Sequence, residues 1–328
     1  MLMKFYFSHG RTAFKYGLIY LGLKKNDCIM MPDYFCDILM DPLKDLGIKP
    51  IFYNIKKDFT TDWRSLPKKY KKKVKALLFI NYFGYEENKK KFQVFCKSKK
   101  IFLIEDNCHS ITVGKYNKKP VSDIIFYSVK KIIKLAYSGG VLEINQKINK
   151  NKPFNMNLKK YRVGLIDKFN NFLEINYLSL KRQLKYFFLK IPNYSKLNGI
   201  KNTKVSQDFL IDDYSKKIIL EKNFKQIKSK RLKNYQLWKD FCSKNEFILP
   251  IKRRLKKNII PWLYPVYIKN KKLRNQILFF GWKNGYSITT WPSLPINLIN
   301  KNNRKIWSEL ICFNTDNAPQ NINKINLN

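Results

Sequence analysis

Histidine is scarce in this sequence, and its cysteines do not stand in short paired motifs. Only 2 of the 328 residues are His, and the 6 Cys include no C-x-x-C pair. A structural zinc site needs four such ligands at short spacings, so no metal site is expected. The cysteines are expected to be reduced thiols of a cytoplasmic protein.

Long apolar runs are also missing. No apolar stretch approaches the roughly 20 residues that span a bilayer, and the start, MLMKFYFSHG, lacks the cleavage pattern of a signal peptide. We therefore expect no integral membrane segment. One basic, amphipathic helical stretch, Phe169 to Ile191, suits a membrane surface. A helix that covers the sheet or forms a dimer contact is the favoured interpretation of that stretch.

Acidic residues are few. The chain has 23 Asp and Glu against 66 Lys and Arg, a formal net charge of +43. Such an excess suggests nucleic acid as a partner, but the lysines are dispersed, and no helix-turn-helix, zinc-finger or RNP-type pattern occurs. We expect weak, salt-sensitive binding to polyanions and no specific nucleic acid. A substrate that carries a diphosphate fits the same charge.

Short apolar strands alternate with helical patterns over the first 145 residues. Expected helices cover 11–23, 37–46 and 88–98, and expected strands cover 28–31, 50–53, 76–80, 101–104 and 124–127. This alternation predicts an α/β fold, with a mostly parallel sheet and helices on both faces. A long helical pattern covers 206–245, and Pro250 follows it. We place a large α/β domain at 1–245 and a small C-terminal α+β domain at 246–328.

The run from Phe102 to Leu142 carries the clearest functional pattern. One expected strand leads into Glu105 and Asp106, and the next leads into Ser128 and a group of lysines. The ends of neighbouring parallel strands share one edge of a sheet, where α/β proteins bind their ligands. A carboxylate for a ring nitrogen, a hydroxyl for a phosphate and an amine for an aldehyde together suit pyridoxal phosphate.

A second informative segment lies near the start of the chain. Gly10, Arg11 and Thr12 open an apolar-periodic helix that Ser8 or His9 would cap. Gly10 would let backbone N–H groups approach an anion closely. Taken alone, however, this segment fits an ordinary capped helix start better than an anion site.

In order and spacing, these segments resemble the DegT/DnrJ/EryC1/StrS aminotransferase family. The matching stretches are HGRTAF (9–14), MMPDYFCDIL (30–39), INYFGY (80–85), IEDNCHS (104–110) and DIIFYSVKK with the later GG (123–140). The resemblance implies a homodimeric fold-type-I enzyme with pyridoxal 5′-phosphate as its cofactor. Such an enzyme would move an amino group from an amino acid to a nucleotide-linked keto sugar, for polysaccharide or glycoconjugate synthesis.

The resemblance also implies roles for single residues. It places the cofactor phosphate on the turn from Gly10 to Thr12, with Ser128 as a further hydroxyl donor. Asp106, rather than Glu105, would face the ring nitrogen and favour its protonated form. His109 stands where the family usually has Gln, near the ring oxygen.

The lysine that would bind the cofactor's aldehyde has three candidates. Lys130, Lys131 and Lys134 all follow the second strand. The usual family spacing from Ser to Lys is two residues longer than that from Ser128 to Lys131, but a subgroup reads Ser-Leu-Arg-Lys. Ser128-Val129-Lys130-Lys131 resembles that version, so Lys131 is chosen and Lys130 is the alternative.

Two departures from the family leave the chemistry open. The family's Asn-Arg-Met-like loop is eroded around Val205 to Leu210, and no Arg can be assigned to the amino donor's carboxylate. Diverged chemistry such as dehydration, a non-catalytic relative, or a polyanion-binding protein on the same fold are the alternatives.

Overall fold

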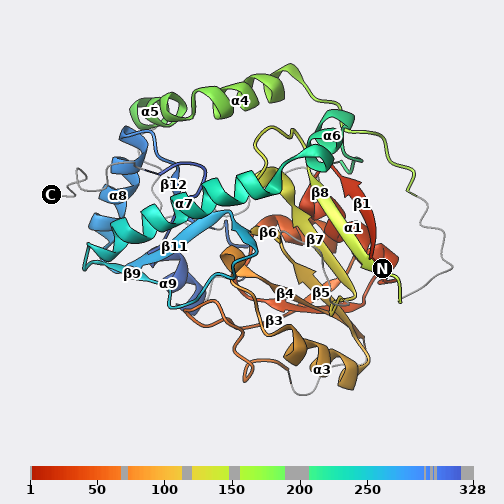
Figure 1. Cartoon of the computed structure of the whole chain (residues 1–328). Helices are drawn as coiled ribbons and strands as arrows, with labels where there is room; N and C mark the ends of the chain where they lie inside the picture. The colour runs from red at the N-terminus through yellow and green to blue at the C-terminus, as the bar shows by residue number, and fades with distance from the viewer. Residues whose placement is uncertain are drawn as a thin grey trace.

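Within the described residues, a sheet of seven strands forms the centre of the fold (Figure 1). The computed structural model describes residues 2–67, 73–112, 120–147, 156–188, 207–291, 293–295, 298 and 301–318. The strands are β1 (Leu2–Phe7), β2 (Cys28–Pro32), β3 (Lys49–Tyr53), β4 (Val74–Ile80), β5 (Phe102–Asp106), β7 (Ile124–Ser128) and β8 (Gly140–Asn145). Their order across the sheet is β1-β8-β7-β5-β4-β2-β3.

The sheet is mostly parallel, as the sequence predicts. Strands β2, β3, β4, β5 and β7 pair in parallel, whereas β8 is antiparallel to both β7 and β1. The edge strand β1 was not among the expected elements. Strand β5 is longer than expected, because it continues through Glu105 and Asp106. The two carboxylates therefore point to opposite faces of the sheet.

Helices cover both faces of this sheet. On one face lie α1 (Gly10–Tyr20) and α2 (Met40–Leu46), where Phe14 stacks on Phe126 at a ring distance of 5.1 Å. On the other face lie α3 (Lys89–Lys99) and α6 (Asp213–Glu221), which pack against the alternate strand residues such as Leu103 and Ile125. The predicted α/β class is confirmed.

A second, antiparallel sheet is built from the C-terminal part of the chain. Its strands are β12 (Ile288–Thr289), β13 (Leu310–Asn314), β11 (Leu263–Ile268) and β9 (Ile248–Pro250), in that order. Helices α7 (Phe224–Ser243), α8 (Lys271–Lys283) and α9 (Lys301–Glu309) accompany it. The expected domain boundary after residue 245 falls just beyond α7, although Trp238 of α7 belongs to the core of this second sheet.

The long helical pattern over 206–245 is confirmed in part, because it forms two separate helices, α6 and α7, from residue 213 onward. Lys222 has an extended backbone (φ −69°, ψ 136°), which ends α6. The side chain of Asn223 then accepts hydrogen bonds from the N–H groups of Lys225 and Gln226 and so caps α7. A local polar cap therefore interrupts an apolar pattern that reads as continuous in the sequence.

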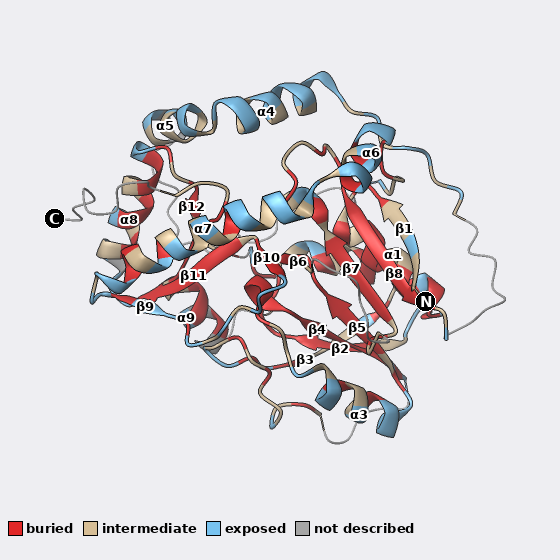
Figure 2. Cartoon of the chain, viewed as in Figure 1, coloured by how far each residue is buried: buried red, intermediate tan, exposed pale blue. Residues whose placement is uncertain are grey.

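The basic, amphipathic stretch also forms two helices, α4 (Leu165–Asn176) and α5 (Leu178–Phe188), with its last residues, 189–191, outside the described part of the chain. No residue of α4 is buried (Figure 2). Leu165 and Phe169 are more than half exposed. The segment thus does not cover the large sheet, which was one half of the favoured interpretation. The other half, a dimer contact, stays a prediction. No described helix combines the length and apolarity needed to cross a membrane.

Candidate active site

A cavity of about 210 Å³ lies where β5 and β7 end, beside the first turn of α1. Six of the seven site residues predicted from the sequence line it: Gly10, Arg11, Asp106, His109, Ser128 and Lys131. The seventh, Thr12, lies in the same turn of α1 but not in the lining. Residues up to 121 positions apart in the sequence are thus brought to one edge of the sheet, where parallel α/β sheets bind their ligands.

Glycine is required at position 140 and favoured at position 10, where α1 meets the end of β7 and the start of β8. A Cβ on Gly10 would lie 3.1 Å from Cys108 Sγ and 3.3 Å from Ser128 Cβ, and one on Gly140 would lie 2.0 Å from the carbonyl oxygen of His9. Without side chains, these positions let the start of α1 pack directly onto the strand ends. The N–H groups of a first helical turn lack intrahelical acceptors, so the turn offers donors to an anion.

The predicted side-chain cap of α1 does not form. His9 occupies the N-cap position but makes no capping hydrogen bond. Its Nδ1 lies 2.9 Å from Ser8 Oγ, and burial, together with the charges of Arg11 and Lys130, lowers the pKa of His9 to about 4. The helix start therefore lacks the ordinary polar cap that would have competed with an anion for its N–H groups.

Two buried polar atoms in this turn test whether a phosphate fits. Arg11 Nε and Thr12 Oγ1 have no hydrogen-bond partner within the described residues. Burial lowers the pKa of Arg11, although the charges of Asp41 and Asp208 oppose this effect. A phosphate would supply acceptor oxygens to both atoms and negative charge to the start of α1. The residues present therefore fit the phosphate group of a cofactor.

Thr12→Val should separate the two roles of the Thr12 hydroxyl. Because Thr12 is 1% exposed and its hydroxyl is buried and unpartnered, removal of the hydroxyl should stabilise the cofactor-free protein by about 1 kcal/mol. The same change should weaken pyridoxal phosphate binding about tenfold, since a charged hydrogen bond is lost. Melting curves and equilibrium titration measure both effects.

Thr61→Val is the matched control for that change. Thr61 is also buried, but its N–H and hydroxyl both donate to Glu87 Oε1. This variant should lower the melting temperature and leave cofactor affinity as it is. If Thr12→Val behaved in the same way, the hydroxyl of Thr12 would have no part in holding an anion.

The two adjacent acids have different partners. Asp106 lines the cavity, and its Oδ1 accepts a 2.7 Å hydrogen bond from the N–H of Cys108. Burial raises the pKa of Asp106, while that hydrogen bond and the charge of Lys131 lower it.

Glu105, on the opposite face, accepts hydrogen bonds from Lys89 Nζ at 2.5 Å and from Asn81, Asn107 and Ser122 at 2.9 Å each. Glu105 therefore serves a buried polar network away from the cavity.

The three candidate lysines are held in three different directions. Lys131 lines the cavity, and its Nζ lies 4.4 Å from the ring centroid of Trp262. Lys130 Nζ donates to the carbonyl of Tyr137 at 2.6 Å. Lys134 Nζ pairs with Glu174 at 3.1 Å and with Asp316 at 3.2 Å. Of the three, the fold brings Lys131 together with Asp106.

His109 is held as a neutral imidazole with a defined tautomer. The N–H of Phe83 donates to His109 Nδ1 at 3.1 Å, so the ring proton resides on Nε2. Burial and the charge of Lys131 lower the pKa of His109 well below its usual range. Trp291 meets the imidazole edge to face, with ring centroids 4.4 Å apart. His109 is therefore a hydrogen-bond donor at a fixed place in the cavity wall.

A protein-family model matches residues 6–155, the segment that carries all seven predicted site residues. Over this segment the chain matches the DegT/DnrJ/EryC1/StrS aminotransferase family. The resemblance inferred from the sequence is thereby confirmed. No curated protein matches the chain in sequence.

Solved aminotransferase structures share the fold of the whole chain. NtdA of Bacillus subtilis, solved with bound cofactor PMP, has 16% identity and a TM-score of 0.63, with 95% of this chain and 68% of that chain covered. A putative sugar aminotransferase of Streptococcus pneumoniae in its PLP form has 15% identity and a TM-score of 0.63, with 98% and 84% covered. PseC of Helicobacter pylori, an aminotransferase involved in pseudoaminic acid biosynthesis, has 16% identity and a TM-score of 0.62, with 98% and 84% covered. At such low identity these likenesses establish the fold, which is the predicted fold-type-I fold.

Two tryptophans outside the DegT/DnrJ/EryC1/StrS match lie at the site, Trp291 in the wall of the cavity and Trp262 beside Lys131, and the sequence did not assign either to it. Strand β10 (Ile259–Pro261) pairs with β6 (Ser110–Thr112), and Trp262 N–H donates to the carbonyl of His109 at 3.1 Å. This pairing brings Trp262 to Lys131, while Trp291 lines the cavity itself. The PWLYPV and ITTWPSL stretches were visible in the sequence, but no periodic signal linked them to a site more than 120 residues away.

Proposed function

We propose that this protein is a pyridoxal-phosphate-dependent aminotransferase that acts on a nucleotide-linked keto sugar, with an amino acid as amino donor. The observation that carries this proposal is one cavity in which Lys131 and Asp106 lie beside a helix start with unpartnered polar atoms. The family match over residues 6–155 and the shared fold support the same conclusion.

The cavity residues divide the binding of the cofactor among them. Pyridoxal phosphate, when bound, supplies an electron sink for the substrate's reacting carbon. The first turn of α1, with Arg11, Thr12 and Ser128, would bind the phosphate. The Nε2–H of His109 would donate to the ring oxygen.

Asp106 would hold a proton on the ring nitrogen. A carboxyl whose pKa has been raised by burial is destabilised while it is charged and unpaired. A protonated ring nitrogen beside it would remove that penalty and keep Asp106 ionised. The ring would in turn remain cationic, which favours withdrawal of electrons from the substrate.

Lys131 would bind the cofactor's aldehyde through Nζ and, once displaced by the amino donor, move a proton to and from the substrate carbon. Among the described residues that line the cavity, only Lys131 carries an amine. Proton transfer by a positioned amine commonly contributes about 10²- to 10⁴-fold to a rate.

The finer assignments rest on the family resemblance and on charge. We propose a cytoplasmic homodimer that serves polysaccharide or glycoconjugate synthesis. The net charge of +43 suits a substrate with a diphosphate, because a cationic surface concentrates anionic ligands.

An absorbance spectrum of the protein with pyridoxal phosphate tests the enzyme class. A covalent link between Lys131 and the aldehyde should give a band near the visible edge that borohydride abolishes.

Melting curves at two salt concentrations should show a larger stabilisation by the cofactor than by any oligonucleotide, with nucleic-acid effects that fade as salt rises. A protein that ignores the cofactor, but is stabilised at high salt by one particular nucleic acid, would instead be a polyanion-binding relative on this fold.

A further inference from the structure

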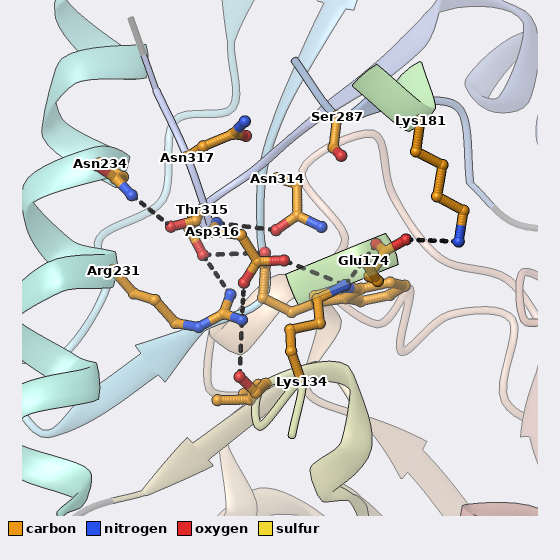
Figure 3. A network of polar contacts seen from close by, with 12 residues as sticks. Lys134, Glu174, Lys181, Arg231, Asn234, Ser287, Asn314, Thr315, Asp316 and Asn317 are labelled. Atoms are coloured by element: carbon orange, nitrogen blue, oxygen red, sulfur yellow. Dashed lines mark hydrogen bonds and ion pairs between the residues drawn. The ribbon is translucent and has the colours of Figure 1, made fainter. Parts of the chain in front are cut away.

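Arg231, on α7, lies where four segments of the chain meet (Figure 3). Its side chain is 3% exposed and does not line the cavity. Nη2 donates to the carbonyl of Ile132 at 2.9 Å and pairs with the carboxylate of Asp316, and Nη1 donates to Thr315 Oγ1 at 2.8 Å. Ile132 is the residue that follows Lys131, so Arg231 binds the backbone directly behind the cofactor lysine.

The same guanidinium also supports the ring that covers Lys131. The hydroxyl of Thr315 bonds to the carbonyl of Pro261 at 2.8 Å, and the N–H of Thr315 donates to the carbonyl of Trp262 at 3.2 Å. The indole of Trp262 lies over Lys131 Nζ. Arg231 is therefore connected to Lys131 through its backbone neighbour on one side and through its aromatic neighbour on the other.

Through Asp316, the segment after Lys131 is held at a second position, Lys134, in addition to Ile132. One carboxylate oxygen pairs with Arg231 and the other with Lys134 Nζ, three residues beyond Lys131 (Figure 3). Glu174 of α4 holds Lys134 from the opposite side and also pairs with Lys181 and Arg182 of α5. The turn from η3 (Val129–Lys131) to Lys134 is thus held at Ile132 and at Lys134 by groups outside the cavity.

We propose that Arg231 is a positioning residue that keeps Lys131, rather than Lys130 or Lys134, directed into the cavity. This inference rests on the proposed role of Lys131. Arginine suits the task because its planar fork donates to the Ile132 carbonyl, Thr315 and Asp316 at once, whereas a lysine ammonium is a single point charge. Without the Arg231 guanidinium, the turn from η3 to Lys134 should sample orientations in which Lys130 or Lys134 reaches the cofactor's aldehyde.

Arg231→Lys tests this role, with Arg274→Lys as the matched control. Arg274 is 1% exposed, its guanidinium lies 5.4 Å from the ring centroid of Trp307, and it does not line the cavity. Each variant replaces a buried guanidinium with an ammonium, so each protein should have a lower melting temperature than the wild type. Only Arg231→Lys should redistribute the cofactor label. Each protein is treated with pyridoxal phosphate and borohydride, and the pyridoxyl group is located by peptide mass spectrometry.

The expected result is that the ratio of label on Lys131 to label on Lys130 and Lys134 falls about tenfold in Arg231→Lys and stays at the wild-type value in Arg274→Lys. Amide hydrogen exchange of the cofactor-free protein gives a second readout: exchange over residues 129–136 should quicken about tenfold in Arg231→Lys alone. Asp316→Asn, which keeps an acceptor for Arg231 but removes the charge that Lys134 needs, should change both readouts in the same direction by a smaller factor.

The outcomes separate the two proposals. A wild-type protein that takes no label on Lys130, Lys131 or Lys134 would overturn the proposed function, while the exchange data would still test the anchoring by Arg231. Wild-type label on Lys130 or Lys134 in place of Lys131 would overturn the positioning role and leave the enzyme class intact. Wild-type labelling on Lys131 with an unchanged ratio and unchanged exchange in Arg231→Lys would overturn the positioning role alone. If Arg231→Lys fails to fold, the same two measurements on Asp316→Asn decide.

Discussion

Lys131→Ala should abolish both the borohydride-reducible cofactor link and amino transfer. Of the three lysines after β7, Lys131 is the one that lines the cavity with Asp106. Its loss removes the aldehyde-binding amine and the proton carrier, so turnover should fall by at least about 10³-fold. The spectrum with cofactor, peptide mapping after reduction and a turnover assay measure the loss.

Lys130→Ala and Lys134→Ala are the controls for Lys131→Ala. Lys130 is bound to the Tyr137 carbonyl, and Lys134 is paired with Glu174 and Asp316, so both variants should keep the reducible link. Lys134→Ala should also melt at a lower temperature, because two carboxylates lose a partner. A pyridoxyl group found on Lys130 of the wild-type protein would refute the choice of Lys131 and leave the enzyme class intact.

Asp106→Asn should mainly lower turnover, whereas Glu105→Gln should mainly lower stability. Asp106→Asn removes the charged partner of the ring nitrogen, so turnover should fall by about 10²-fold or more while the cofactor still binds in part. Glu105→Gln weakens the ion pair with Lys89 inside a network of four hydrogen bonds. It should lower the free energy of unfolding by about 2 kcal/mol and affect turnover less.

Parallel measurements of turnover and denaturant unfolding on both variants check this pair of effects. The physical basis is that adjacent residues of a strand face opposite sides, so one acid meets the cavity and the other meets a buried polar network. Equal losses of turnover in the two variants, with equal stability, would show that neither acid faces the ring as proposed.

Local pattern alone was enough to predict the five parallel strands in the first half of the chain, but not β1, β6 or β8. Apolar runs of four or five residues separated by amphipathic helices correspond to β2, β3, β4, β5 and β7 of a mostly parallel sheet. The polar residues that follow these runs then had to meet at one sheet edge. The sequence alone could therefore predict one site that contains Asp106, Ser128 and Lys131, because this prediction needs only the order of the strands and their direction.

Other features depended on tertiary contacts that have no periodic signature. Pairing of β10 with β6 places Trp262 over Lys131, and Arg231 reaches the Ile132 carbonyl from a helix 99 residues later in the chain. The break between α6 and α7 depended on a local side-chain cap that competes with an apolar repeat.

The sequence by itself therefore determined the fold class and the set of chemical groups at the sheet edge, because both follow from strand order and residue type. The family resemblance favoured Asp106 and Lys131, but only the tertiary structure decided where each acid and each lysine lies and what holds Lys131 in place. Those choices depend on strand length, on the turn after Ser128 and on side chains supplied by the C-terminal part of the chain, such as Trp262. Contacts of this kind are selected by packing and by the need to satisfy buried polar groups, and such selection acts only when the whole chain is folded.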